Sequence, residues 1–422
     1  VGKAALRANT TGFDNTSVGA QSLEVSTVGH QNSALGYKAL EANTTGNNNT
    51  AIGQGALDAN TTGNSNTAVG RNALSANTTA SNNVAVGYAA LENNTTASYG
   101  TAVGYQALNV NTTGASNSAF GARALDANTT GDYNTALGGW ALSANTTADS
   151  NTAVGYHSLL ANTTGTQNTA VGAISLDANT TGIENTAIGY QSLSANTTAS
   201  FNTALGRKAL RDNTTGNSNT AAGTDALLET TTGSLNTAVG YQSLAANTTA
   251  NDNTAVGYKA LKVNTTGTRN TGIGCSAFDA NTTGSYSVAV GYGALSANTT
   301  ANYNTAVGYN ALTDCTTGAN NTAVGESAAA NVTTGAYNTA LGNTSLFANT
   351  TSNHNTAIGY AALNVVTGEK NTSVGSNSLV AATTGHTNTA VGYAAGSAIT
   401  TGHENVAIGG NALDALTTGN DH

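Results

Sequence analysis

The chain has 422 residues, only 8% of them charged, and a formal net charge of −9 at pH 7. This sparse negative charge provides neither a basic surface for nucleic acid nor a polybasic segment for anionic lipid, and no apolar run is long enough to span a bilayer. Two or three ordinary domains would fit this length, but no linker or shift in composition divides the chain.

The sequence is an array of a 17-residue repeat, whose positions we number as columns, with Asn15 in column 1. The string Asn-Thr-Ala-Val-Gly recurs at this spacing up to Asn355, where one unit of 16 residues intervenes. We predict a single continuous repeat array over residues 1–422, with a truncated first unit, 1–14, followed by 24 units over 15–421. Because the chain begins inside a repeat, without Met or a signal-peptide pattern, we expect it to be a segment of a longer or processed protein.

Columns 2 to 5, typically Thr-Ala-Val-Gly, predict a short strand that ends in a sharp change of direction. Column 4 is apolar in all 24 units, and column 5 is glycine in all 24. Threonine and β-branched residues favour strands, and glycine permits the turn that follows. Each strand is expected to pair in parallel with its equivalent one unit further along.

Columns 6 to 11 have a period of three, because columns 6 and 9 are bulky, columns 7 and 10 are mostly polar, and columns 8 and 11 are mostly small. This pattern favours a helical turn or an extended arc over a second strand. Columns 12 to 15, typically Asn-Thr-Thr-Gly, have the chemistry of a turn. The predicted fold is all-β: a parallel β-solenoid (β-roll or β-helix) with one rung per 17-residue repeat and short helical or arc turns between strands.

A single unit buries too little apolar surface to fold alone, so stability must accumulate between neighbouring units. Stacking is expected to bury continuous columns of valine, leucine and alanine. The core of such a solenoid is lean, which favours lateral association of chains.

The strand string with its fixed glycine and small-residue turn, as in NTAVGYQSLAANTTA from Asn236, resembles the head repeats of trimeric autotransporter adhesins. The fuller form NTAVGYxALxxNTTG is similar to repeats of phage tail-fibre and related surface proteins that end in a self-cleaving chaperone domain. The resemblance covers essentially the whole chain. It implies a left-handed β-roll with three chains around one axis, in an extracellular, cell-surface or virion fibre.

Column 12 is asparagine in 16 of the 24 units, and Asn9 belongs to the same column. Each of these residues begins Asn-Thr-Thr, an N-glycosylation acceptor pattern. The alternative is an internal ladder in which each amide bonds to its copies in neighbouring rungs. Apolar replacements such as Val332, Ile399 and Leu416 favour the ladder, because a column that accepts them is not fully solvated. The candidate glycan acceptors are Asn9, Asn43, Asn60, Asn77, Asn94, Asn111, Asn128, Asn145, Asn162, Asn179, Asn196, Asn213, Asn247, Asn264, Asn281, Asn298 and Asn349.

Other columns leave further alternatives open. The threonine of column 13, such as Thr129, is either a ladder member or an O-glycan acceptor. Ice binding would require the threonines of columns 2 and 13 to share one flat exposed face. Tyrosine fills column 6 in 11 units, either as half-buried packing with a solvated hydroxyl or as a surface that stacks on sugars or on a partner fibre.

Column 15, usually glycine, becomes alanine or serine at intervals of 51 residues from Ala97 to Ser352. Duplication of a three-unit block accounts for this spacing, and a three-rung docking lattice is the alternative.

No catalytic pattern accompanies the repeats, because the six histidines are scattered without a carboxylate pair, a nucleophile elbow or a phosphate-binding loop. The acidic residues are too irregular for repeated calcium loops. Cys275 and Cys315 lie in different columns more than two rungs apart, so we do not expect them to pair. The sequence therefore predicts no enzyme, no cofactor and no metal site.

We predict a structural segment of an extracellular fibre or surface appendage, rod-like and self-associating as a trimer or a polymeric fibre, either bare or coated with covalent glycans. The alternatives are an adhesin head or phage tail-fibre shaft that binds a receptor or host-surface glycan, and an ice-binding β-solenoid. Neither nucleic acid nor a membrane span in this segment is expected.

Overall fold

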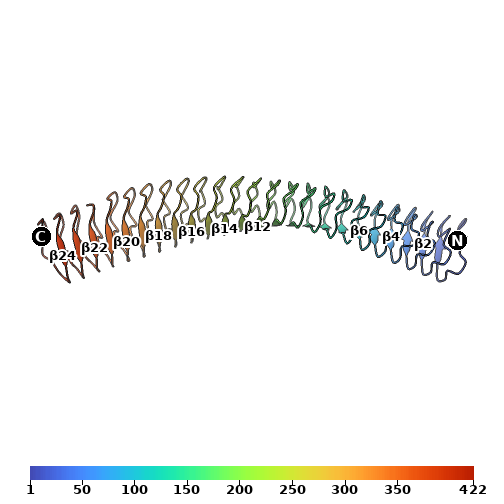
Figure 1. Ribbon diagram of the computed structural model, residues 1–422, viewed down its shortest axis with the longest axis horizontal. Coiled ribbons are helices and arrows are strands. Elements are labelled where there is room, and N and C mark those ends of the chain that lie inside the picture. Colours follow the sequence, from blue (N-terminus) through green and yellow to red (C-terminus); the bar gives the residue numbers. More distant parts are fainter. The chain divides into compact units, whose positions relative to one another are not determined.

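The computed structural model describes residues 1–422 as an all-β parallel β-solenoid without any helix, which confirms the predicted fold class (Figure 1). The chain divides into two compact units, Val1–Thr215 and Gly216–His422. Each compact unit is a stack of rungs, one rung for each repeat, and each rung contributes one strand. The 17-residue spacing does not change at the boundary between the units, so the sequence predicts one continuous array there.

Every strand is three residues long. The strands of the first unit are β1 (Thr16–Val18), β2 (Ser33–Leu35), β3 (Thr50–Ile52), β4 (Thr67–Val69), β5 (Val84–Val86), β6 (Thr101–Val103), β7 (Ser118–Phe120), β8 (Thr135–Leu137), β9 (Thr152–Val154), β10 (Thr169–Val171), β11 (Thr186–Ile188) and β12 (Thr203–Leu205). Those of the second unit are β13 (Thr220–Ala222), β14 (Thr237–Val239), β15 (Thr254–Val256), β16 (Thr271–Ile273), β17 (Val288–Val290), β18 (Thr305–Val307), β19 (Thr322–Val324), β20 (Thr339–Leu341), β21 (Thr356–Ile358), β22 (Thr372–Val374), β23 (Thr389–Val391) and β24 (Val406–Ile408).

Within each unit every strand pairs in parallel with the strand of the next rung, and residues of the same column face each other. In the first unit, for example, Thr152 pairs with Thr169 and Val154 with Val171. In the second unit Thr237 pairs with Thr254. The predicted pairing of each strand with its equivalent one unit along is confirmed.

Only the middle residue of each strand faces the interior. In β9, Ala153 is fully buried, whereas Thr152 and Val154 are partly exposed. The inward side chain must be small because it packs against the leucine of the preceding rung: at Gly272, which replaces this alanine in β16, a Cβ would lie 3.1 Å from Leu261 Cγ. The prediction that stacking buries a valine column is therefore wrong. The alanine and leucine columns are buried, and the valine column faces outward.

Columns 6 to 11 form an arc that contains no helix. Columns 7 and 9 take left-handed φ values, 59° at Lys38 and 55° at Leu40, which side chains of this size rarely adopt. The Lys38 N–H donates to the Ala20 carbonyl of the preceding rung (3.0 Å), and the Leu40 N–H donates to the Ala56 carbonyl of the following rung (2.9 Å). The predicted alternative of a helical turn is wrong, because these peptide groups bond to neighbouring rungs and not within their own turn.

The unit of 16 residues keeps its place in the sheet. β21 and β22 still pair Thr356 with Thr372, although 16 residues separate them where the other strands are 17 apart. The turn around Gly368, where this unit has one threonine in place of two, absorbs the missing residue. The strand register is therefore independent of the length of this turn.

Candidate functional site

The most regular exposed surface is the outer strand face, which we define as the side chains of columns 2 and 4 in the strands. Column 2 is threonine, serine or valine, and column 4 is valine, isoleucine, leucine, phenylalanine or alanine, so this face carries no charge in any of the 24 units. Its largest side chains are well exposed: Leu35 is 50% and Leu137 is 48% accessible. The strands position these groups because alternate residues of a strand point to opposite faces.

Comparison of columns within the chain shows that the outer strand face is under an unusual constraint. Column 17 is mostly exposed and columns 7, 10 and 16 are mostly partly exposed, and all four columns vary between charged, polar and other residues. Column 4, in contrast, is apolar in all 24 units although none of its side chains is buried. An exposed column that behaves like a core column is typical of a surface that another molecule covers.

Tyrosine columns flank the outer strand face at both strand ends. All 16 tyrosines lie either in column 6, two residues after the strand, or in column 17, two residues before it. Rings of neighbouring rungs stack, as for Tyr241 and Tyr258 in column 6, whose centroids are 5.5 Å apart, and for Tyr286 and Tyr303 in column 17, at 5.1 Å. Sequence reasoning identified column 6 but missed column 17, although no tyrosine lies outside these two columns.

The tyrosines of column 6 are between 42% and 62% exposed. This agrees with the prediction of half-buried rings whose hydroxyls reach solvent. The rings also leave a face or an edge open to a partner, so packing and recognition do not exclude each other here.

The asparagines of column 12 form hydrogen-bonded ladders that run from rung to rung within both compact units, Val1–Thr215 and Gly216–His422. Asn128 Nδ2 donates to Asn111 Oδ1 (2.8 Å) and to the Gly131 carbonyl (3.0 Å), and the same two bonds recur, for example, at Asn77 and Asn264. Asn298 and Asn349 donate to the carbonyl three residues further on. These side-chain amides are buried and their N–H groups are used in hydrogen bonds, so a glycan could not be attached without opening the rung. The structure therefore argues against glycans at the sixteen buried asparagines of this column. They are Asn43, Asn60, Asn77, Asn94, Asn111, Asn128, Asn145, Asn162, Asn179, Asn196, Asn213, Asn247, Asn264, Asn281, Asn298 and Asn349, all 0% exposed.

Asn9 differs from these sixteen residues because it is exposed. Its Nδ2 donates to the Gly12 carbonyl at 2.9 Å. A glycan at Asn9 stays a prediction. The hydroxyls of column 13 are also engaged: Thr129 Oγ1 donates to the Thr146 carbonyl of the next rung at 3.0 Å, as expected of a ladder member.

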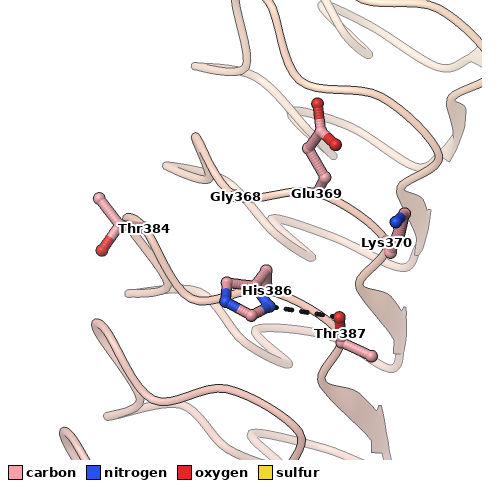
Figure 2. Close-up of a pocket in the computed structure, with 6 residues that line it drawn as sticks. All are labelled: Gly368, Glu369, Lys370, Thr384, His386 and Thr387. Atoms are coloured by element: carbon pink, nitrogen blue, oxygen red, sulfur yellow. Dashed lines mark hydrogen bonds between the residues drawn. The ribbon is translucent and has the colours of Figure 1, made fainter.

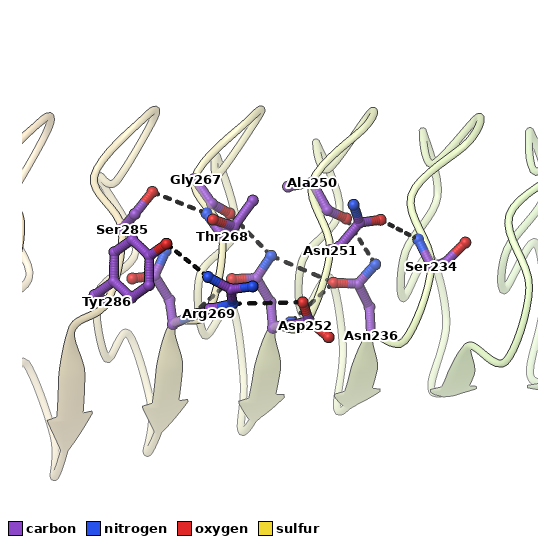
Figure 3. Close-up of polar contacts among 12 residues, drawn as sticks. Ser234, Asn236, Ala250, Asn251, Asp252, Gly267, Thr268, Arg269, Ser285 and Tyr286 are labelled. Atoms are coloured by element: carbon purple, nitrogen blue, oxygen red, sulfur yellow. Dashed lines mark hydrogen bonds and ion pairs between the residues drawn. The ribbon is translucent and has the colours of Figure 1, made fainter.

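A second amide ladder, which sequence reasoning missed, runs along column 1. Asn151 Nδ2 donates to the Gly165 carbonyl at 2.9 Å, and Asn151 Oδ1 accepts the backbone N–H of Asn168 at 3.0 Å. Figure 3 shows the same contact from Asn236 to the Ala250 carbonyl, 2.8 Å. Asparagine occupies column 1 in 22 of the 24 units, and this near-invariance was the available signal.

Outside this second ladder, Figure 3 shows a polar network on the exposed columns 16 and 17. Asn251 Oδ1 accepts the Ser234 N–H at 2.7 Å. Arg269 bridges its neighbours, with Nη1 donating to the Tyr286 hydroxyl at 2.6 Å and Nε 3.7 Å from the Asp252 carboxylate. These side chains differ from rung to rung, so they fit an ordinary solvated surface.

The alanines of column 15 lie inside the rungs. Ala97, Ala148 and Ala250 are each at most 5% exposed, and so is Ser352. Their side chains therefore cannot form the docking lattice considered as the alternative to duplication.

A cavity of about 310 Å³ lies beside the shortened unit (Figure 2). Its lining includes Gly368, Glu369, Lys370 and His386, and His386 Nδ1 lies 3.3 Å from Thr387 Oγ1. The cavity occurs where the chain lacks one threonine, so the missing residue accounts for it.

Among the acidic groups and thiols, burial is the main cause of the pKa shifts, whereas side-chain hydrogen bonds to Glu41 and Tyr258 raise the pKa of Lys38 and Lys259. Burial raises the pKa of the carboxyl groups of Asp58, Asp126, Asp177 and Asp279, all in column 10, above the usual range. Burial also raises the pKa of the Cys315 thiol to about 12. Both cysteines are free, and no group of three or more His, Cys, Asp or Glu side chains is placed to hold a metal ion.

A helix able to cross a bilayer is absent from the chain. No protein-family model matches the sequence, and no curated protein matches it. The resemblance to adhesin and tail-fibre repeats therefore depends on the quoted repeat strings alone.

Proposed function

We propose that the chain is a structural segment of an extracellular fibre, whose copies associate side by side through the outer strand face. One observation carries this proposal: column 4 is apolar in all 24 units, yet none of its side chains is buried in the folded chain, since twelve are exposed and twelve are partly exposed. The extracellular location and the number of three chains follow the resemblance to adhesin and tail-fibre repeats.

A second copy of the chain is the occupant that best fits this face. Its own rungs repeat at the same spacing of roughly 4.8 Å, so each rung meets an equivalent rung in register. The face is uncharged, so two copies meet without repulsion, and the flanking tyrosines are of the type enriched at protein interfaces. Side chains of valine, leucine and threonine are self-complementary in such a contact.

The energetics explain why many rungs are needed. Covering a half-exposed valine or leucine contributes about 1 kcal/mol per rung of each copy. Association costs about 4–15 kcal/mol in lost freedom of motion. A few rungs are too few to offset this cost, whereas the twelve strands of either unit are enough.

We expect sedimentation equilibrium to give a particle mass of three times 41.5 kDa. The variant Leu35→Lys, Leu137→Lys, Ile188→Lys places three charges on the outer strand face and should sediment as a folded monomer, because like charges would be buried against each other. The matched control Thr45→Lys, Thr147→Lys, Thr198→Lys places the same charges in the same three rungs at exposed positions of column 14, and should keep the native mass. A native mass of 41.5 kDa, or a face variant that stays associated, would contradict the proposal.

Ice binding is a second candidate, favoured by the pairing of threonine in column 2 with an apolar residue in column 4 on one outward face. The sequence prediction placed the second threonine row in column 13, but those hydroxyls are bonded to backbone carbonyls, as at Thr129. A monomeric protein that binds ice through this face should depress the freezing point below the melting point. The three-lysine face variant should lose that thermal hysteresis, and the column 14 control should keep it.

A further inference from the structure

A cluster of aromatic side chains interrupts the surface pattern of the first unit. We define the aromatic patch as Arg123, Trp140, Tyr156 and His157. Column 6 is small on both sides of Tyr156, with Gly139 before it, so Tyr156 lacks a tyrosine in the neighbouring rungs. Column 7, in contrast, places arginine, tryptophan and histidine in three successive rungs. Local departures from an otherwise consistent pattern are expected at functional sites.

The rings of the aromatic patch hold one another in place. Arg123 Cζ lies 4.7 Å from the centroid of the Trp140 ring. The Tyr156 and His157 rings are stacked with centroids 3.8 Å apart, and His157 meets Trp140 edge to face at 6.4 Å. The four side chains therefore form an ordered surface rather than four independent groups.

An open cavity of about 440 Å³ lies between these rings. Trp140 and Ser143 line it from one rung, and Tyr156, His157 and Leu160 line it from the next. Trp140 is 37% and Tyr156 55% exposed. The cavity thus combines accessible aromatic surface with a hydroxyl and an imidazole.

The aromatic patch carries one formal positive charge, on Arg123. Arg123 lies near Asp126, and His157 lies near Asp177, close enough for each basic group to lower the pKa of its carboxyl partner against the larger effect of burial. Asp177 Oδ1 is buried and has no hydrogen-bond partner. The Arg123 guanidinium already lies over the indole ring and near the Asp126 carboxylate, so it is not a free positive charge for an anion.

We propose that the aromatic patch binds a neutral saccharide. The C–H face of a pyranose ring packs on Trp140 or Tyr156, and its hydroxyl groups bond to Ser143 and His157. A neutral ligand with one apolar face and many hydroxyls matches exposed rings beside a hydroxyl and an imidazole. The aromatic patch lies in columns 6 and 7, beside the outer strand face and not on columns 2 and 4, so its test by Trp140 fluorescence is separate from the test of chain association by particle mass.

Trp140 is the only tryptophan of the chain, so its fluorescence reports directly on the patch. Cellohexaose, maltohexaose and tetra-N-acetylchitotetraose should be titrated against the full-length protein. We expect a saturable change in Trp140 emission with at least one of them, with a Kd on the order of 1 mM or tighter. If none of the three oligosaccharides gives a saturable change, the proposal is overturned.

Matched variants locate the binding. Tyr156→Ala should weaken the Kd at least ten-fold, whereas Tyr258→Ala, which removes a stacked tyrosine of column 6 in the second unit, should leave it unchanged. Calorimetric titration of Trp140→Ala should show no binding. Undiminished binding to Trp140→Ala or to Tyr156→Ala, with the thermal midpoint retained, would overturn the assignment.

Discussion

Replacing Gly155 with alanine is expected to lower the free energy of unfolding by more than about 4 kcal/mol. Gly155 has a φ of 131°, and a Cβ there would lie 2.6 Å from the carbonyl carbon and oxygen of Gly172 in the next rung. Neither the backbone of Gly172 nor that of Gly155 can move without breaking the bonds between their rungs. The change in free energy would be measured by urea unfolding followed by circular dichroism.

Gly139→Ala is the matched control for this substitution. A Cβ at Gly139 would lie 3.7 Å from Tyr156 Cδ2, which is an ordinary contact. The control should therefore change the free energy of unfolding by less than about 0.5 kcal/mol. Equal effects of the two substitutions would show that close packing of rungs at column 5 does not limit stability.

Replacing Asn128 with aspartate is expected to lower the free energy of unfolding by about 3–5 kcal/mol at neutral pH. The carboxylate would be fully buried and could not donate to Asn111 Oδ1 or to the Gly131 carbonyl. Burial would raise the pKa of this carboxyl in the folded state above its unfolded value, so folding would take up a proton. Stability should therefore recover as the pH falls and decline as it rises, in urea unfolding measured across pH.

Asn128→Val is the control for the charge, because the chain itself places Val332 and Val366 in this column, both fully buried. It also removes the two donated hydrogen bonds but buries no charge. We expect a loss of about 2 kcal/mol that does not vary with pH. A pH-independent loss in the aspartate variant would contradict a buried ladder at this position.

Much of the fold follows from the repeat itself. A fixed spacing of 17 residues with one short β-rich segment per unit leaves a parallel solenoid as the simplest way for every unit to bury the same columns. Burial of column 12 was also predictable, because Val332 and Ile399 replace asparagine there. The near-invariance of asparagine in column 1 was a signal for the second ladder, but the column has no apolar replacement that would indicate burial, so the ladder was missed.

Composition alone could not predict that the valine column faces outward, because a protein core and an outer face covered by another molecule both favour the same apolar residues. The strand length determines which of these side chains can point inward. With three residues in β9, only one side chain points inward. At Gly272, in the same inward column, a Cβ would lie 3.1 Å from Leu261 Cγ, so this position admits only small side chains, which are alanine, serine or glycine in all 24 units. The aromatic patch was missed for a different reason: the repeat spacing already places Trp140 beside His157 and Tyr156, but only the structure shows that their rings contact one another and line an open cavity.

The backbone hydrogen bonds between rungs also determine how each unit responds to tension. Because the Lys38 and Leu40 N–H groups bond to opposite neighbours, a pull along the stack loads the interfaces between rungs in series. Rungs would then detach one at a time, and each would release a 17-residue segment that extends to roughly 55 Å. A solenoid built in this way would lengthen in equal steps under load, with one force for every step, and would absorb mechanical work without failing at a single point.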